Sequence, residues 1–180
     1  MSDPSMKVIG LAGWSGSGKT TLIEQVIRVL TARGLSVSLI KHAHHKFDVD
    51  VPGKDSWRHR QAGCKEVLVS SDNRWVLMHE LRDAEPEMEL DALLGKLSDC
   101  DLALIEGFKR APIDKVEIYR AGASESMMFP HDPHIVAVAT DVHDLDTGLR
   151  PRLDINDPAQ VADFIQAHCL SRRAEVSRVG

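Results

Sequence analysis

The sequence predicts an α/β fold in which helices flank a mainly parallel sheet and part of the chain forms an antiparallel β extension. Short apolar stretches typical of buried strands alternate with helical patterns, which favours parallel pairing. Residues 66–80 and 113–130 interrupt that alternation, and we expect them to form the antiparallel extension. Residues 1–170 are expected to fold as one domain of ordinary size, followed by a frayed polar tail over 171–180.

The first half of the chain begins with a strand, a glycine-rich loop and a helix. Residues 7–12 predict a short buried strand, and residues 36–41, rich in β-branched and apolar side chains, predict a second one. Between them, residues 20–33 repeat apolar side chains at helical spacing, and Gly34 stands where a glycine commonly ends a helix. A long polar loop follows the second strand, and a short helix is expected near 55–62.

Strand patterns dominate the second half of the chain until its last helix. The predicted strands cover residues 66–70, 74–79, 101–107, 116–120 and 134–141, and a helix is expected near 89–97. The triplet SDN between the first two of these strands predicts a hairpin. The final helix is expected to begin at Pro158, with Asp157 as its N-cap and Gln160 completing a capping box.

Composition and charge argue against several classes of protein. The 180 residues are 43% apolar and 27% charged, as in globular domains, and the net charge of −5 argues against a broad basic surface for nucleic acid. No apolar run approaches the roughly 18 residues of a membrane helix, and the amino terminus lacks a signal-peptide pattern. The three cysteines are scattered, so we expect reduced thiols in a cytoplasmic protein without a structural zinc site.

Residues 13–20, GWSGSGKT, match the phosphate-binding pattern G-x-x-x-x-G-K-[ST], which predicts a fold like that of P-loop NTPases. The glycines let backbone N–H groups point at phosphates, and the following helix adds the positive end of its dipole. Lys19 would meet the β- and γ-phosphates, and the Thr20 hydroxyl would hold Mg²⁺. A glycine turn that binds nothing is the alternative, but the predicted strand and helix on either side argue against it. The expected nucleotide-binding residues of this loop are Gly13, Ser15, Gly16, Ser17, Gly18, Lys19, Thr20 and Thr21.

A P-loop site also needs a carboxylate for its metal ion, usually at the end of a nearby apolar strand. Glu106 ends such a strand and would face Thr20 across Mg²⁺, because the carboxyl ends of parallel strands face the ligand crevice. We expect Glu106 and Lys19 to take part in catalysis, and Gly107 to let a backbone N–H approach the γ-phosphate. The alternative is that Glu106 is an acid in a solvated turn.

The polar loop after the second strand holds a cluster of histidines and acids, HAHHKFDVD. This is no standard zinc spacing, and Mg²⁺ prefers oxygen ligands, so a loop linked to the nucleotide is favoured. Asp48 or Asp50 would then help to hold Mg²⁺, while Lys41 or one of the histidines (His42, His44, His45) would meet a phosphate or a second substrate. A solvated polar loop is the alternative.

Asp141 and Trp14 are each open to two interpretations. Asp141 stands at the end of a late strand, where an acid could accept hydrogen bonds from the N1–H and N2 amino group of guanine, and no N-K-x-D motif is present to do so. Alternatively, Asp141 caps the turn before Val142. Trp14, inside the glycine loop, would either pack against a neighbouring loop or contact a partner.

Several motifs, taken in order, resemble one known family. The segments GWSGSGKTTL, LIKHAHH, DVDVPGKDS, LIEGFK, AVATD and LDINDPAQVADFI are similar to the MobB family, molybdopterin-guanine dinucleotide biosynthesis protein B, from about residue 7 to residue 170. The family's phosphate-binding residues correspond to 16–20 here, and its Mg²⁺ carboxylates to Glu106 and Asp50. The family resembles P-loop proteins that often carry an extra lysine second in the loop, where this chain has Trp14.

The resemblance implies a GTP-binding protein with weak GTPase activity and Mg²⁺, acting as a homodimeric adapter in molybdenum cofactor maturation. The implied partners are GTP, the molybdopterin guanylyltransferase, and molybdopterin or its guanine dinucleotide form, with no nucleic acid and no membrane. Two alternatives belong to other classes: a P-loop kinase or transferase for a small substrate, and a non-catalytic binding module stabilised by nucleotide. A kinase would need a lid of arginines, to which Arg58 and Arg60 could contribute.

Overall fold

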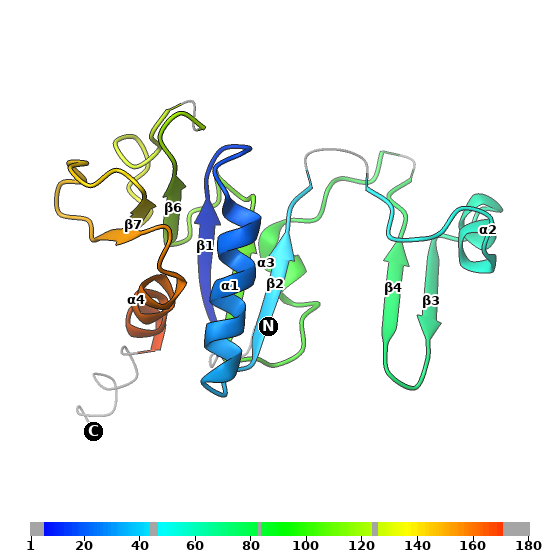
Figure 1. Ribbon diagram of the computed structural model, residues 1–180. Helices are drawn as coiled ribbons and strands as arrows, with labels where there is room; N and C mark the ends of the chain where they lie inside the picture. The colour runs from blue at the N-terminus through cyan, green and yellow to red at the C-terminus, as the bar shows by residue number, and fades with distance from the viewer. Residues whose placement is uncertain (1–5, 44–46, 83, 124–125, 171–180) are drawn as a thin grey trace, which may run out of the picture. The chain divides into compact units, whose positions relative to one another are not determined.

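The computed structural model describes residues 6–43, 47–82, 84–123 and 126–170 (Figure 1). These residues divide into two compact units, one within Met1–His42 and Leu90–Gly180 and the other within Ala43–Glu89. The single domain expected over residues 1–170 stays a prediction. The expected tail, residues 171–180, lies outside the described residues.

A six-stranded parallel sheet forms the centre of the first unit. Its strands lie in the order β2-β5-β1-β6-β7-β8, and every neighbouring pair is parallel. The carboxyl ends of parallel strands meet at one edge, so the loop that leaves β1 lies beside the ends of β5 and β6. The strands are β1 (Lys7–Ala12), β2 (Val37–Lys41), β5 (Leu102–Glu106), β6 (Lys115–Tyr119), β7 (Ile135–Thr140) and β8 (Arg152–Asp154).

Helices cover both faces of this sheet. α1 (Lys19–Ala32) and α4 (Pro158–Leu170) pack on one face, where their apolar side chains share a buried cluster with those of β1, β5, β6 and β7 (Figure 1). α3 (Leu90–Leu94) packs on the other face with side chains of β2 and β5. Full burial of one leucine or isoleucine contributes about 1.5–3 kcal/mol, so these clusters fix the helices on the sheet and the P-loop between β1 and α1.

The second unit contains a helix and a two-stranded hairpin. α2 (Asp55–Gln61) packs on β3 (Glu66–Ser70), which pairs antiparallel with β4 (Trp75–His79) in the register Glu66↔His79 to Ser70↔Trp75. The prediction of an antiparallel hairpin is therefore confirmed for residues 66–80. Residues 71–74, which include the SDN triplet, form the short turn between β3 and β4.

The prediction that residues 113–130 belong to the antiparallel extension was wrong. β6 is a parallel strand of the main sheet, between β1 and β7, and its side chains are buried on both faces. Val116 and Ile118 face the main core, whereas Lys115 and Glu117 are each only 1% exposed on the opposite face. An alternation of apolar and charged residues is typical of a strand with one face in solvent. The prediction failed because both charged side chains have buried partners, which the sequence does not show.

Those partners are provided by the chain around β6. The Lys115 ammonium donates to the carbonyl of Ala111 at 2.7 Å and pairs with Asp132 at 3.0 Å. Glu117 accepts the backbone N–H groups of Met128 and Phe129, both at 2.7 Å. Burial raises the pKa of Glu117, against the opposing effect of these two hydrogen bonds.

The other predicted helices and strands agree with the structure within a few residues at each end. The short strand β8 was missed because three residues carry too little pattern to predict a strand. Of the helices in the described ranges, none has both the length and the apolar character needed to cross a bilayer.

Candidate nucleotide-binding site

The P-loop connects the end of β1 to the first turn of α1. Gly18 is the N-cap residue of α1 and has a φ of 85°, a left-handed conformation that glycine adopts without strain. Gly18 has no side chain to cap the helix, so the first N–H groups of α1 keep their donor capacity. An anion is well suited to this end of the helix dipole. Ser15, Gly16, Thr20 and Thr21 are exposed, whereas Gly13 and Ser17 are buried.

The Ser17 side chain tests whether the loop fits a phosphate. It is 0% exposed, and among the described residues its hydroxyl oxygen is the buried side-chain polar atom that lacks a hydrogen-bond partner. A buried hydroxyl without a partner costs free energy, and such groups are rare in native structures. Phosphate oxygens would accept from this hydroxyl and from the loop N–H groups, so the donor set fits a phosphate group.

The Lys19 ammonium is held over the same loop. It donates to the carbonyl oxygen of Trp14 at 2.6 Å. Burial lowers its pKa, and the neighbouring ammonium groups of Lys109 and Lys41 lower it further, while Glu106 opposes the shift. The site therefore carries an excess of positive charge around Lys19, which favours an anionic ligand.

Glu106 ends β5 beside the P-loop, as the sequence predicted. It pairs in register with Leu11 of β1 and with Lys41 of β2, and its carboxylate lies 3.3 Å from the Lys41 ammonium. Glu106 is 6% exposed, so the alternative of an acid in a solvated turn does not hold. The carboxylate is thus positioned at the strand end that the P-loop leaves, in the position expected of a metal ligand.

Gly107 makes a close approach of two strand ends possible. Its φ is 94°, and a Cβ atom at this position would lie 2.9 Å from the carbonyl oxygen of His42. His42 in turn donates its backbone N–H to the carbonyl of Glu106 at 2.9 Å. A side chain at Gly107 would therefore push β2 and β5 apart beside the site. His44 and His45, expected as possible phosphate contacts, lie outside the described residues.

Trp14 packs against two other loops of the same chain. Its indole N–H donates to the carbonyl of Ser126 at 2.6 Å, and the Lys109 ammonium lies 3.9 Å from the centre of its ring. The sequence offered no signal for Ser126. Lys109 was not singled out from the sequence as a site residue either, although its place two residues after Gly107 puts it at the same sheet edge.

Asp141 lies just beyond β7 and is held by the chain that follows β6. Its carboxylate accepts from the Arg120 guanidinium at 3.2 Å and from the backbone N–H of Ala121 at 3.1 Å. The N–H of Val142 is instead accepted by the hydroxyl of Thr140, at 3.1 Å. A Cβ atom on Gly18 would lie 3.8 Å from Nε of Arg120. The guanidinium that binds Asp141 therefore lies beside the start of α1.

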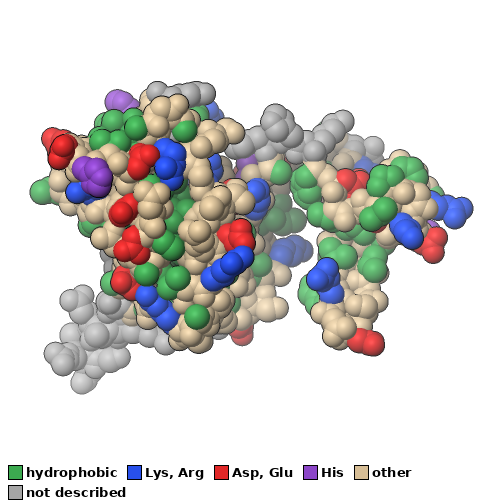
Figure 2. Space-filling model, viewed as in Figure 1, with side chains coloured by type: hydrophobic (Ala, Val, Ile, Leu, Met, Phe, Trp, Pro, Cys, Tyr) green, Lys and Arg blue, Asp and Glu red, His purple; other side chains and the backbone are tan. Residues whose placement is uncertain are grey.

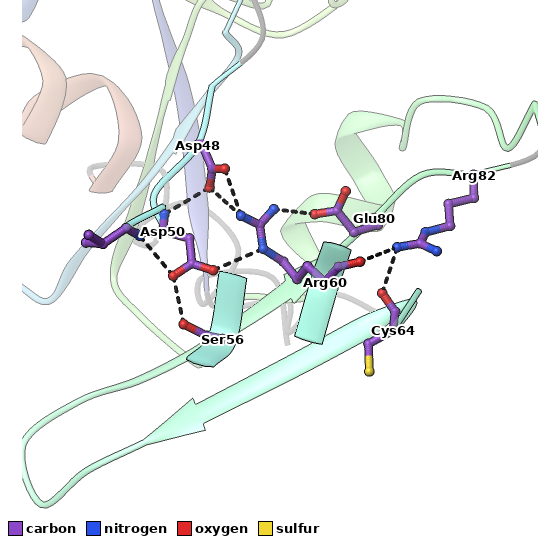
Figure 3. A network of polar contacts seen from close by, with 8 residues as sticks. Asp48, Asp50, Ser56, Arg60, Cys64, Glu80 and Arg82 are labelled. Atoms are coloured by element: carbon purple, nitrogen blue, oxygen red, sulfur yellow. Dashed lines mark hydrogen bonds and ion pairs between the residues drawn. The ribbon is translucent and has the colours of Figure 1, made fainter. Parts of the chain in front are cut away.

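Asp50 belongs to the second unit and takes part in a polar network there (Figure 3). Its carboxylate accepts from the Ser56 hydroxyl at 2.7 Å and from Nε of Arg60 at 3.1 Å. Burial alone would raise the pKa of Asp50, but these hydrogen bonds lower it overall. Arg60 also binds both oxygens of Asp48 and lies 2.6 Å from Glu80. The network connects α2 to the preceding loop and to the residue that follows β4, and the magnesium role of Asp50 stays a prediction.

A Mg²⁺ ion at this site would need few protein groups. In the part of the chain that the structure describes, no group of three or more His, Cys, Asp or Glu side chains is arranged to hold a metal ion. This agrees with the chemistry of Mg²⁺, which keeps several water ligands and uses one or two protein oxygens together with phosphate oxygens. Thr20 and Glu106 fit that requirement at the P-loop.

Comparison with known proteins decides the family. The family model described as "Molybdopterin guanine dinucleotide synthesis protein B" matches residues 8–141 of this chain. The chain belongs to this family. The resemblance of the ordered sequence motifs is thereby confirmed.

Close relatives and solved structures of the family cover most of the chain. It is 46% identical over 164 residues to the molybdopterin-guanine dinucleotide biosynthesis adapter protein of Escherichia coli (strain K12), covering 88% of this chain and 90% of that protein. The adapter protein of the same name from Haemophilus influenzae (strain ATCC 51907 / DSM 11121 / KW20 / Rd) is 43% identical over 162 residues, covering 88% of this chain and 87% of that protein. The crystal structure of Bacillus subtilis MobB aligns with a TM-score of 0.71 at 25% identity, covering 91% of this chain and 98% of that one. The predicted α/β fold with an antiparallel extension is confirmed.

Proposed function

We propose that this protein binds GTP with Mg²⁺ at its P-loop and acts as an adapter in the biosynthesis of molybdopterin guanine dinucleotide. The observation that carries the nucleotide site is the buried hydroxyl of Ser17, which has no hydrogen-bond partner among the described residues and lies inside the phosphate-binding loop. The adapter role is supported by the family and by the names of the relatives from Escherichia coli and Haemophilus influenzae. We propose that the protein is located in the cytoplasm.

The residues at the loop would have different roles in binding the nucleotide. Lys19 and the N–H groups at the start of α1 neutralise phosphate charge, and the Ser17 hydroxyl donates to a phosphate oxygen. Thr20 and Glu106 would hold Mg²⁺, and the ion would neutralise phosphate charge. Asp141 is proposed to accept hydrogen bonds from the guanine base.

Hydrolysis by the isolated protein should be slow. Fast GTPases position the attacking water with a glutamine and stabilise the transition state with an arginine. Here Phe108 and Lys109 follow Gly107, so no glutamine stands at that point of the sequence. We therefore expect turnover far below one per second, which suits an adapter whose nucleotide state changes with its partner.

The proposed partners are the molybdopterin guanylyltransferase, molybdopterin or its guanine dinucleotide form, and a second copy of this chain. The hairpin of the second unit supports the homodimer. Leu68, Trp75 and Leu77 lie on one face of the hairpin of β3 and β4, and Leu68 and Trp75 are 61% and 64% exposed. Figure 2 shows hydrophobic side chains at the surface of this unit. A two-stranded sheet with an apolar face is marginal by itself, so a symmetric partner would cover it.

Single-turnover kinetics with GTP and Mg²⁺, with and without molybdopterin, test the proposed function. Slow release of free phosphate supports a weak GTPase adapter. Phosphorylated pterin would instead indicate a kinase, and bound GTP without any turnover would indicate a binding module. A turnover of several per second without a partner would contradict the proposed mechanism.

A further inference from the structure

Two ammonium groups meet at Trp14, the second residue of the P-loop. The Lys19 ammonium donates to the Trp14 carbonyl at 2.6 Å, and the Lys109 ammonium lies 3.9 Å from the centre of the Trp14 ring. Lys19 belongs to α1, whereas Lys109 follows β5. Segments far apart in the sequence therefore bring two cations to one residue of the phosphate-binding loop.

Trp14 is a fixed platform for the second cation. The indole N–H is anchored on the carbonyl of Ser126 at 2.6 Å, so the ring cannot rotate freely. A tight turn, in which the N–H of Lys109 donates to the carbonyl of Gly107 at 2.9 Å, starts the lysine side chain close to the end of β5. An ammonium over the face of a tryptophan is attracted by the ring quadrupole, so this arrangement keeps Lys109 at the loop.

Cations outnumber acids among the neighbours whose charges shift the pKa of Lys19. The ammonium groups of Lys109 and Lys41 lower this pKa, and the Glu106 carboxylate raises it. Glu106 is itself 3.3 Å from Lys41, and Lys109 forms no ion pair with an acid of the described residues. Like charges gathered in a partly buried site repel one another unless an anion compensates them.

We propose that Lys109 is a second phosphate-binding cation of this site, held against the P-loop by the ring of Trp14, and that it acts on the terminal phosphate. This inference rests on the proposed function, because it assumes a nucleotide at the loop. Lys109 lies two residues beyond Gly107 and three beyond Glu106, on the side of the site where the metal carboxylate stands. Its charge should therefore favour a nucleoside triphosphate over the diphosphate.

The test compares a non-hydrolysable GTP analogue with GDP by calorimetry on the full-length protein. Lys109→Met, which keeps the apolar stem and removes the charge, should weaken binding of the triphosphate about tenfold, the effect of one charge-assisted contact, and change GDP binding less than about twofold. Lys109→Arg should retain triphosphate affinity, because it keeps the charge and the cation–π contact. Trp14→Leu should shift the triphosphate-to-diphosphate ratio in the same direction as Lys109→Met, because the platform is lost.

Lys96→Met is the matched control. Lys96 is an exposed lysine in the turn before β5, at the opposite end of that strand from the P-loop, and its loss should leave both affinities unchanged. Thermal melts of each variant check that the fold is intact. Lowered triphosphate affinity together with an unchanged melt, and a shallower salt dependence of binding, support the proposal.

Three results would overturn the proposal in distinguishable ways. If Lys109→Met bound both nucleotides with the affinity of the parent protein while Lys19→Ala lost binding, the role of Lys109 would be rejected and the proposed function would stand. An equal loss for triphosphate and diphosphate would reject the assignment to the terminal phosphate. If the parent protein bound neither nucleotide, both the proposed function and this inference would fail.

Discussion

At the scale of single residues, the Lys19 ammonium is held over the P-loop by the carbonyl of Trp14. Charge-assisted contacts contribute about 1.5–3 kcal/mol, so Lys19→Ala should weaken GTP binding by at least about tenfold. The fold should persist, because Lys19 lies at the first turn of α1 and not in the core. Isothermal calorimetry measures the affinity, with Lys96→Ala as a control for loss of a lysine elsewhere. Unchanged GTP affinity in Lys19→Ala would remove the basis for a site at this loop.

The lowered pKa of Lys19 predicts how GTP affinity depends on pH. Its pKa is lowered, first by burial and then by Lys109 and Lys41, whereas a bound phosphate would favour the charged form. GTP affinity should therefore fall as pH rises through the lowered pKa of Lys19, and binding in that range should take up a proton. Calorimetry in two buffers of different ionisation enthalpy detects the proton. Affinity that is constant up to the ordinary pKa of lysine would contradict this.

Asp141 is the residue with which to test base recognition. Its carboxylate is oriented by Arg120 and by the N–H of Ala121, so it has a defined position beyond β7. If it reads guanine, Asp141→Asn should disfavour GTP and favour XTP, because the new amide donates to the C2 oxygen of xanthine. A lost or mismatched contact of this kind costs about 1–3 kcal/mol. The GTP-to-XTP affinity ratio is the measurement, since general damage to the site cancels in it; an unchanged ratio would mean that Asp141 does not read the base.

At the scale of elements, the hairpin carries a pH-dependent contact at its open end. His79 pairs in register with Glu66, and its ring nitrogens lie 2.7 Å from Glu66 and 3.2 Å from Glu85. The hydrogen bond to Glu66, with a smaller effect of Glu85, raises the pKa of His79 above 6.5 despite partial burial. Because folding raises the pKa of His79, the contact stabilises the fold fully at pH values below the pKa of this histidine in the unfolded chain. That stabilisation is lost as the pH rises through the pKa of His79 in the folded protein.

The titration of His79 by NMR tests that contact. Glu66→Gln should lower the pKa of His79 and flatten the loss of stability with rising pH, because the dominant partner loses its charge. Asp72→Asn removes a carboxylate from the exposed hairpin turn without a contact to His79, and should leave the pKa where it was. An unshifted His79 in Glu66→Gln would show that the pair does not form in solution.

At the scale of the whole molecule, we expect a C₂ dimer that covers the apolar face of the hairpin. Leu77→Glu places a charge among Leu68 and Trp75 and should convert the dimer to a monomer at tens of micromolar, roughly the concentration at which a modest interface holds. Leu149→Glu is the control, because Leu149 is a fully exposed leucine in a loop of the other unit. Light scattering or sedimentation gives the mass. A parent protein that is monomeric under these conditions would refute the dimer.

The sequence was sufficient for those parts of the protein that depend on local pattern. The P-loop was recognisable because its glycines, Lys19 and Thr20 stand at fixed spacing between an apolar strand and an amphipathic helix. Glu106 was found by the same reasoning, since an acid directly after an apolar strand lies at the ligand edge of a parallel sheet. Pro158 and Asp157 marked the start of α4, and the Asp157 carboxylate accepts the N–H groups of Ala159 and Gln160, as expected of an N-cap. The capping box is not formed, because the Gln160 side chain accepts the N–H of Asp154 and not that of Asp157.

Only the tertiary structure decided which distant groups meet. Lys115 and Glu117 have the pattern of an exposed strand, and only the folded chain brings Asp132 and the N–H groups of Met128 and Phe129 to them, so β6 became a buried central strand. Lys109 likewise reaches Trp14 because β5 and β1 are neighbours in the sheet, although 95 positions separate the two residues in the sequence. Local propensity and periodicity act over a few residues, whereas the partner of a buried charge is fixed by strand order, which the sequence encodes only through the packing of the whole core.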